Sequence, residues 1–355
     1  MKKLLIVLAV IVGSICLYWY ARPEKTKQAE VKLPEIVSPT PISQKISKNY
    51  VFVPYWTFTK NIVEDSKAAL IYFGVGANEK GIEIGDQGYS KLKTFINLTP
   101  NADERILAVR MLDKNINAKI IKDPTLQEQL ITDAIKIAKE NNFNGILLDY
   151  ETSAFGFDST TNNITAFYKL FSERVGAQNM AFYVTLYGDT YFQSRPFDVK
   201  KIGQMADKVI IMAYDFSKSR GNPGPNFPLT DTNSYGYDFR KMIEDFQKDV
   251  DNQKMVITFG YFGYDWRVDG KGQSLTNGVP LSTNEIEKEF VDKCKYENCN
   301  VIRSAGTSEP SIKYTDESDE EHIIWFEDAI SVEKKKEFLR TKGILEIASW
   351  AYSYY

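Results

Sequence analysis

The stretch from Phe143 to Glu151 constrains the fold more than any other part of the chain. It reads Phe-Asn-Gly-Ile-Leu-Leu-Asp-Tyr-Glu, a short apolar run that ends in two acids. Strand side chains alternate between two faces, and a run that is apolar on both faces predicts a strand of a parallel sheet covered by helices. Asp149 and Glu151 are two residues apart, so they share a face with Leu147 below them. Because buried charge is unfavourable unless it is paired or used, the two acids indicate a site at the end of this strand.

Strand-like runs alternate with helical patterns from Tyr50 to the end of the chain. Further strands are predicted over residues 50–55, 69–75, 105–110, 181–186, 208–214, 255–261 and 344–350, and helices over 126–141, 164–175, 199–205, 237–250 and 332–341. Eight strands that alternate with helices predict an α/β fold, a (β/α)8 TIM barrel over residues 49–355. A doubly wound sheet is the competing architecture. Residues 264–326 are too many for a simple crossover. They contain a predicted helix over 283–294 and two extended runs, 311–315 and 322–326, and so predict a small α+β insertion after the seventh strand.

The N-terminal residues predict export. Residues 1–21 begin with Lys2 and Lys3 and continue as an apolar run that ends in aromatic residues, which is typical of a membrane anchor with its N-terminus in the cytoplasm. Small residues suited to cleavage are missing near Ala21, so an uncleaved anchor is favoured over a cleaved signal segment. Residues 22–48 are rich in Lys, Glu, Pro, Ser and Thr and predict a flexible linker. We therefore expect a single-pass protein of the cell membrane with an extracytoplasmic domain, or a secreted protein if the segment is cleaved.

Composition excludes several classes of function. The 355-residue chain has a net charge of -3, which disfavours nucleic acid as a partner. It contains one histidine, His322, and three cysteines, so neither a His/Cys metal site nor another cofactor is predicted. Cys294 and Cys299 could form a local disulfide in an exported domain or remain reduced.

Polar and aromatic residues gather where other predicted strands end. Since the carboxyl ends of barrel strands meet at one face, the residues there are candidates for a common site. These candidates are Tyr214 and Asp215 after the sixth strand, Tyr264, Asp265 and Trp266 after the seventh, and Trp350 at the end of the eighth.

Three of these segments resemble glycoside hydrolase family 18, the chitinase family. The family's fourth-strand motif is D-G-x-D-x-D-x-E, and the chain has Asn-Gly-Ile-Leu-Leu-Asp-Tyr-Glu from Asn144 to Glu151. Met-Ala-Tyr-Asp at residues 212–215 resembles the family's M-x-Y-D motif. The run from Trp325 to Ser331, followed by a helix and a last strand that ends in Trp350, is also similar. The resemblance covers about residues 50–355.

The resemblance implies retaining hydrolysis of a β-linked N-acetylglucosamine polymer, such as chitin or peptidoglycan, with participation of the substrate's acetamido group. Glu151 would be the general acid and then the base, Asp149 would orient the acetamido group, and Tyr214 would hydrogen-bond its oxygen. Asp215 would hold the sugar, and Trp350 would be the floor on which its ring stacks. Weaker candidates for substrate contact are Tyr55, Phe73, Tyr187, Asp189, Tyr264, Asp265 and Trp266.

Two positions depart from the family motif. Asn144 replaces its first acid and can still form a hydrogen bond. Leu147 replaces its second acid, which would lie under Asp149 and share a proton with it. Leucine instead predicts an apolar barrel layer that desolvates Asp149 from below, so the distribution of protons and the pH optimum are open.

Three functions remain in competition at the level of sequence. The first is the substrate-assisted hydrolase. The second is a lectin-like barrel of the same family that binds carbohydrate without turnover, which Leu147 favours and the retention of Glu151 opposes. The third is a barrel glycosidase in which Asp149 is a direct nucleophile.

Overall fold

The computed structural model describes residues 46–58, 67–152, 156 and 158–355. The predicted anchor at residues 1–21, and all but the end of the linker at 22–48, lie outside these ranges. Within these ranges, no helix is long and apolar enough to cross a membrane.

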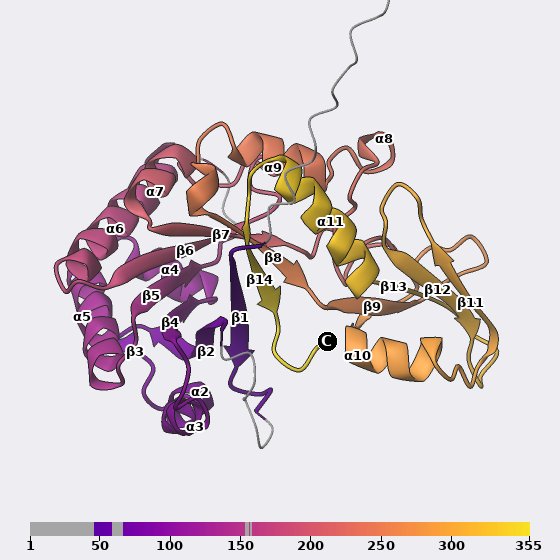
Figure 1. The fold of residues 1–355 in the computed structure, drawn as a ribbon, viewed down its shortest axis with the longest axis horizontal. Coiled ribbons are helices and arrows are strands. Elements are labelled where there is room, and N and C mark those ends of the chain that lie inside the picture. The colour runs from indigo at the N-terminus through magenta and orange to yellow at the C-terminus, as the bar shows by residue number, and fades with distance from the viewer. Residues whose placement is uncertain (1–45, 59–66, 153–155, 157) are drawn as a thin grey trace, which may run out of the picture. The chain divides into compact units, whose positions relative to one another are not determined.

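A closed parallel barrel forms the centre of the described residues (Figure 1). Its eight strands in the described chain are β1 (Lys48–Pro54), β2 (Ala69–Asn78), β4 (Glu104–Met111), β5 (Gly145–Tyr150), β6 (Ala181–Tyr187), β7 (Lys208–Ala213), β8 (Met255–Gly260) and β14 (Glu346–Trp350). They pair in the order β1-β14-β8-β7-β6-β5-β4-β2, and β1 also pairs with β2. This last pairing closes the barrel, so the predicted fold is confirmed and the doubly wound alternative is wrong.

Helices surround the barrel on its outer side (Figure 1). They are α2 (Gln87–Ser90), α3 (Leu92–Leu98), α4 (Lys114–Ile120), α5 (Pro124–Glu140), α6 (Asp158–Gly176), α7 (Val199–Met205), α8 (Thr232–Tyr235), α9 (Phe239–Phe246), α11 (Ala329–Thr341) and the 3-10 turn η1 (Asn252–Lys254). Helix α5 begins two residues before its predicted start. The carboxylate of Asp123 accepts hydrogen bonds from the backbone N–H groups of Thr125 and Leu126, and Pro124 occupies the first helical position. Aspartate caps of this kind satisfy the free N–H groups that begin a helix.

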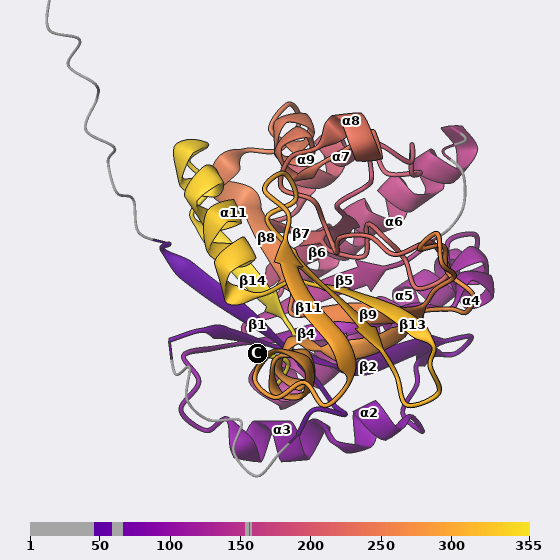
Figure 2. The ribbon, with the colours of Figure 1, turned by 90° about the vertical axis from the view of Figure 1, so that its right-hand side faces the viewer.

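The insertion after β8 builds a second, antiparallel sheet. It contains β9 (Phe262–Arg267), β10 (Val279–Ser282), β11 (Glu297–Arg303), β12 (Pro310–Thr315) and β13 (Glu321–Phe326), in the order β10-β9-β13-β12-β11. Figure 2 shows this sheet beside the barrel strands. The sheet begins at Phe262, and the predicted helix over 283–294 divides into α10 (Thr283–Ile286) and a π-helical turn, η2 (Glu287–Val291). A disulfide joins Cys294 to Cys299, which resolves the open alternative for this pair.

Two apolar layers hold the barrel together, and the inner one determines the floor of the site. The outer layer packs the strands against the helices. The inner layer includes Phe52, Ile71, Ile106, Leu147 and Val256 and fills the barrel interior. Leu147 is fully buried in this layer, as the sequence predicts. A short strand, β3 (Gly81–Ile82), pairs with the end of β2 outside the closed barrel.

Candidate active site

A cleft of about 1000 Å³ opens at the carboxyl ends of the barrel strands. Nine of the twelve residues that the sequence predicts for the site line it, among them Phe73, Asp149, Glu151, Tyr214, Asp215, Tyr264 and Trp350. The weaker candidates Tyr187 and Asp189 line it too. Barrel closure therefore brings residues from five strands and the small sheet to one place.

Asp149 lies at the bottom of this cleft and is almost fully buried. Its Oδ1 atom accepts a hydrogen bond of 2.5 Å from the hydroxyl of Thr185 on β6. Burial, and then the nearby charge of Glu151, raise the pKa of Asp149 to about 7, while Thr185 and Arg110 act in the opposite direction. Because the two carboxyl groups interact, they should titrate as one unit.

Glu151 follows β5 directly and is anchored through its backbone. Its N–H donates to the carbonyl of Met111, and the Asn117 amide donates to its carbonyl oxygen at 2.7 Å. Its Oε2 atom accepts a hydrogen bond of 3.1 Å from the hydroxyl of Tyr187. Burial raises the pKa of Glu151 above its ordinary value, although Tyr187 and nearby cations oppose this shift. A carboxyl group with a raised pKa can remain protonated near neutral pH and act as a general acid.

Tyr214 and Asp215 follow β7, which is separated from β5 by β6 in the barrel. Burial and the neighbouring carboxylates raise the pKa of Tyr214 far above its ordinary value, so its hydroxyl remains a hydrogen-bond donor. Asp215 adopts a left-handed backbone conformation with φ of 58°. Asn226 stabilises this conformation because its Oδ1 atom accepts the N–H of Asp215 at 2.7 Å. The hydroxyl of Tyr264 donates to Asp215 Oδ1 at 2.6 Å, so the small sheet helps to position this carboxylate.

Trp350 stands at the end of β14 among other rings. Its ring centroid lies 4.8 Å from that of Phe73, 5.5 Å from that of Phe52 and 6.3 Å from that of Tyr214. Exposed Trp56 extends the group at 6.4 Å. These rings fix the orientation of Trp350, whose partly exposed side chain offers an apolar surface in the cleft.

Three predicted site residues, Tyr55, Asp265 and Trp266, do not line the cleft. Asp265 instead accepts a hydrogen bond of 2.6 Å from the hydroxyl of Tyr314. Trp266 is fully buried, and its Nε1–H donates to the carbonyl of Ser219 at 3.1 Å. Trp266 lies on β9 two residues after Tyr264, and Gly278 and Ser219 cover its ring. The prediction that it contacts substrate is therefore wrong. Tyr55 is also absent from the lining and packs its ring 4.9 Å from that of Trp56.

Thr185 and Arg195 are cleft residues that the sequence analysis missed. Arg195 forms a two-point ion pair with Asp189, and its guanidinium lies 3.8 Å from the ring centroid of Tyr187. A signal for Thr185 was present in the sequence. Thr185 and Tyr187 have the same two-residue spacing at the end of their strand as Asp149 and Glu151 have on theirs.

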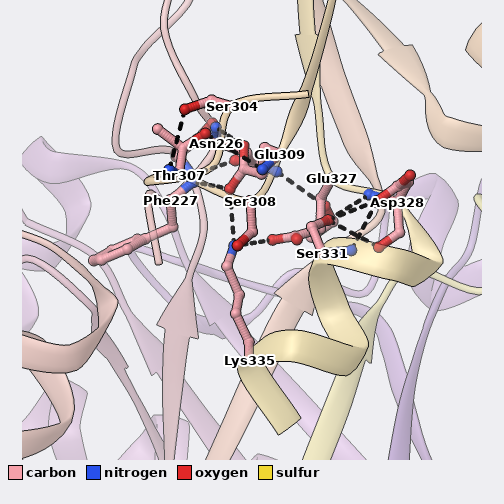
Figure 3. Close-up of polar contacts among 12 residues, drawn as sticks. Asn226, Phe227, Ser304, Thr307, Ser308, Glu309, Glu327, Asp328, Ser331 and Lys335 are labelled. Atoms are coloured by element: carbon pink, nitrogen blue, oxygen red, sulfur yellow. Dashed lines mark hydrogen bonds and ion pairs between the residues drawn. The ribbon is translucent and has the colours of Figure 1, made fainter. Parts of the chain in front are cut away.

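A buried ion cluster contacts the segment that contains Asn226 and Phe227 (Figure 3). Glu309, Glu327 and Lys335 have no exposed surface, and the ammonium of Lys335 contacts both carboxylates. The carboxylate of Glu309 also accepts the backbone N–H groups of Asn226 and Phe227 at 2.5 and 2.8 Å. The cluster thereby ties the insertion and α11 to the segment that positions Asp215.

One group of side chains in the described ranges is close enough to share a metal ion. It consists of Asp316, Glu320 and His322, at the turn between β12 and β13. None of the three lines the cleft. The cleft itself combines a protonatable acid, a second carboxylate, a phenol and an aromatic surface, which suits acid–base chemistry on a sugar ring.

Comparison with known proteins identifies the family. The model for glycosyl hydrolases family 18 matches residues 113–354, which is more than half of the chain. The chain belongs to glycosyl hydrolase family 18. The matched residues include both carboxylates of the cleft, Tyr214, Asp215 and Trp350.

Several known proteins are similar to the chain at low identity. A protein of Bacillus subtilis named as a sporulation-specific glycosylase is 24% identical over 257 residues, covering 71% of this chain and 57% of its own. The cortical fragment-lytic enzyme of Bacillus anthracis is 24% identical over 246 residues, covering 66% and 52%. The chain thus spans just over half the length of these two relatives. The structure of a class V chitinase from Nicotiana tobaccum in complex with NAG4 shares the fold, with a TM-score of 0.74, 14% identity and coverage of 88% and 95%.

Proposed function

We propose that this family 18 protein is an extracytoplasmic glycoside hydrolase that cleaves β-linked N-acetylglucosamine polymers of the chitin or peptidoglycan type. The observation that carries the proposal is the convergence of Asp149, Glu151 and Tyr214 in one cleft beside Trp350. The raised pKa of Glu151 suits a general acid.

The proposed reaction is a substrate-assisted displacement in two steps. The sugar stacks on Trp350, and the Glu151 carboxyl gives its proton to the leaving glycosidic oxygen while the acetamido oxygen of the substrate attacks the anomeric carbon. Tyr214 donates a hydrogen bond to that acetamido oxygen, and the carboxylate of Asp149 accepts from the acetamido N–H and stabilises the positive oxazolinium. Glu151, now a carboxylate, removes a proton from water as the water attacks the same carbon, and the bond between that carbon and the acetamido oxygen breaks. The configuration of that carbon is retained.

Two observations support an exported setting. The apolar segment at residues 1–21 has the composition of an anchor, and the disulfide between Cys294 and Cys299 is typical of domains outside the reducing cytosol. A protein anchored at the cell membrane would meet wall glycan first. The name of the relative from Bacillus anthracis, which refers to cortical fragments, agrees with a role on such a glycan.

A lectin-like function is the second candidate, because Leu147 removes the inner acid of the family motif. One fold neighbour, human YKL-39, is described as a pseudo-chitinase with retained chitooligosaccharide binding. Glu151 and its raised pKa favour the enzyme over this reading.

Release of reducing ends from chitin oligomers and from peptidoglycan fragments would test the proposal. We expect turnover by the wild type, a strong loss in Glu151→Gln, and no turnover of substrates that lack the N-acetyl group. Equal release by the wild type and Glu151→Gln would contradict the enzyme function. Turnover of substrates without the N-acetyl group would instead favour Asp149 as a direct nucleophile.

A further inference from the structure

Strand β6 presents two hydroxyl groups to the two carboxylates of the cleft. The register of β5 and β6 places Leu147 opposite Tyr183 and Leu148 opposite Val184. If the same register continues, Thr185 lies opposite Asp149 and Tyr187 lies opposite Glu151. Each hydroxyl donates one hydrogen bond to its carboxylate, at 2.5 Å for Thr185 and 3.1 Å for Tyr187.

The partner of Asp149 matters because the residue beneath it cannot exchange a proton. Leu147 fills that position and is fully buried. The carboxylate of Asp149 is therefore desolvated from below, and the hydroxyl of Thr185 donates a hydrogen bond to it. A hydroxyl group that donates a hydrogen bond to a carboxylate oxygen stabilises the ionised form of that acid. Thr185 thus opposes protonation of Asp149, as Tyr187 opposes protonation of Glu151, while burial raises the pKa of both acids.

Tyr187 is held more firmly than an ordinary strand-end tyrosine. The guanidinium of Arg195 lies 3.8 Å from the centroid of its ring. Arg195 is itself fixed by Asp189, with distances of 2.5 Å from Nε to Oδ1 and 2.8 Å from Nη2 to Oδ2, and both side chains are nearly buried. Because the ring is fixed, its hydroxyl occupies Oε2 of Glu151 and leaves Oε1 as the oxygen available for proton transfer.

We propose that Thr185 and Tyr187 are positioning residues that distribute the proton between Asp149 and Glu151, in place of the acid that Leu147 lacks, and that Arg195 locks Tyr187 for this task. The proposal rests on the proposed function only for its predicted effect on the pH dependence of turnover. The distribution of the proton itself is a property of the free protein.

Other charged and titratable groups face the pair and also affect its titration. Arg110 on β4 and Tyr168 on α6 face Asp149, and Tyr214 and Asp215 after β7, together with Lys218, face the cleft side. All of them stay in place when Thr185 or Tyr187 is changed. A change in titration after those substitutions would therefore report the loss of the hydroxyl.

The test is the pH dependence of kcat/KM for the full chain and its variants. Thr185→Val should move the acidic limb to higher pH by about one unit, because Asp149 loses the donor that stabilises its charge. Tyr187→Phe and Arg195→Gln should move the basic limb to higher pH, because Glu151 then keeps its proton longer. Thr185→Ser keeps a hydroxyl and should restore the wild-type limb.

Tyr183→Phe is a matched control on the same face of β6. Its hydroxyl donates to Glu104 at 2.8 Å, at the other end of the strand, so its loss should leave the shape of the profile unchanged. If Thr185→Val and Tyr187→Phe lower kcat/KM at every pH but leave both limbs of the pH profile where the wild type has them, the proposal is overturned. If the wild type shows no turnover, the proposed function fails. Carboxyl ¹³C NMR titration of the same variants then tests the inference, because the pKa values of Asp149 and Glu151 should shift in the same directions. Unchanged pKa values for both acids would overturn it.

Discussion

The cleft pair, Asp149 and Glu151, and the cluster pair, Glu309 and Glu327, are both carboxylates withdrawn from water, but only the second pair encloses a cation. Lys335 contacts both acids of the cluster, and Glu309 also accepts two backbone N–H groups. Neither Asp149 nor Glu151 forms an ion pair with any of the described residues, and each has a single hydroxyl donor from β6. Asp149 is nearly as buried as Glu309 and Glu327, and Glu151 is partly buried, yet only the cluster pair has a cation.

This difference indicates what each pair contributes. Two carboxylates with a shared lysine and backbone donors can stabilise the joint between the insertion, α11 and the loop before Asn226. Two carboxylates without a cation are unfavourable in their ionised form, and the proton that one of them keeps lies in the cleft. The pKa of Glu309 is raised as well, but Glu309 does not line the cleft. The cleft pair therefore fits chemistry better than stability.

Glu151→Gln should give the largest effect on function. The amide keeps the shape of the side chain but cannot donate an acid proton, so we expect kcat to fall by roughly 10²- to 10⁴-fold. Binding of chitin oligomers, measured by calorimetry, should change only a few-fold. Glu104→Gln is the control, because this carboxylate binds Tyr183 at the other end of the barrel and should leave kcat within a few-fold. An equal loss in both variants would remove the special role of the cleft acid.

Lys335→Met should give the largest effect on stability. It leaves Glu309 and Glu327 buried without their cation, and we expect the free energy of unfolding in urea to fall by about 3–5 kcal/mol. Lys334→Met is a matched control on the same helix, since Lys334 is exposed, and should change stability by less than about 0.5 kcal/mol. Similar small effects in both variants would show that the cluster does not hold the joint together.

Glu309→Gln should alter the pH dependence of stability. Burial raises the pKa of Glu309 to about 8 despite the opposing effect of Lys335. A pKa raised in the folded state means that stability is fully present below the ordinary pKa and is lost as pH rises through about 8. The free energy of unfolding of the wild type should thus fall between about pH 5 and pH 9, and Glu309→Gln should show a smaller fall. An identical slope in both proteins would place the titration elsewhere.

The barrel and most of the cleft could be predicted because their signals are local. Runs that are apolar on both faces mark barrel strands such as β5 and β8, and residues at their carboxyl ends meet at one face of the barrel. Strands β9, β10 and β11 were not predicted. Strand β10 has only four residues, and β10 and β11 lie at sheet edges with largely exposed residues. Strand β9 begins only two residues after the end of β8, so the sequence does not separate the two. Trp266 was misplaced because nothing in its own segment shows that Ser219 and Gly278 cover it.

The partners of the predicted residues could not be read from the sequence, because they depend on register and on distant segments. The hydrogen bond from Thr185 to Asp149 requires the pairing of β5 with β6. The contact between Glu309 and Lys335 joins the insertion to α11. Sequence patterns identified Asp149 and Glu151 as a pair of site acids, but only the tertiary structure shows that they lack a cation while Glu309 has one.

Urea unfolding of the Asp149→Asn, Glu151→Gln double variant tests most directly whether the cleft pair is kept for chemistry at the expense of stability. Burial raises the pKa of Asp149 to about 7, so its contribution to stability is present at acidic pH and is lost as pH rises through that value. At about pH 8 the double variant should be more stable than the wild type by about 1–3 kcal/mol, and the difference should disappear near pH 4, where both carboxyls are protonated. A double variant that is less stable than the wild type at about pH 8 would contradict the account.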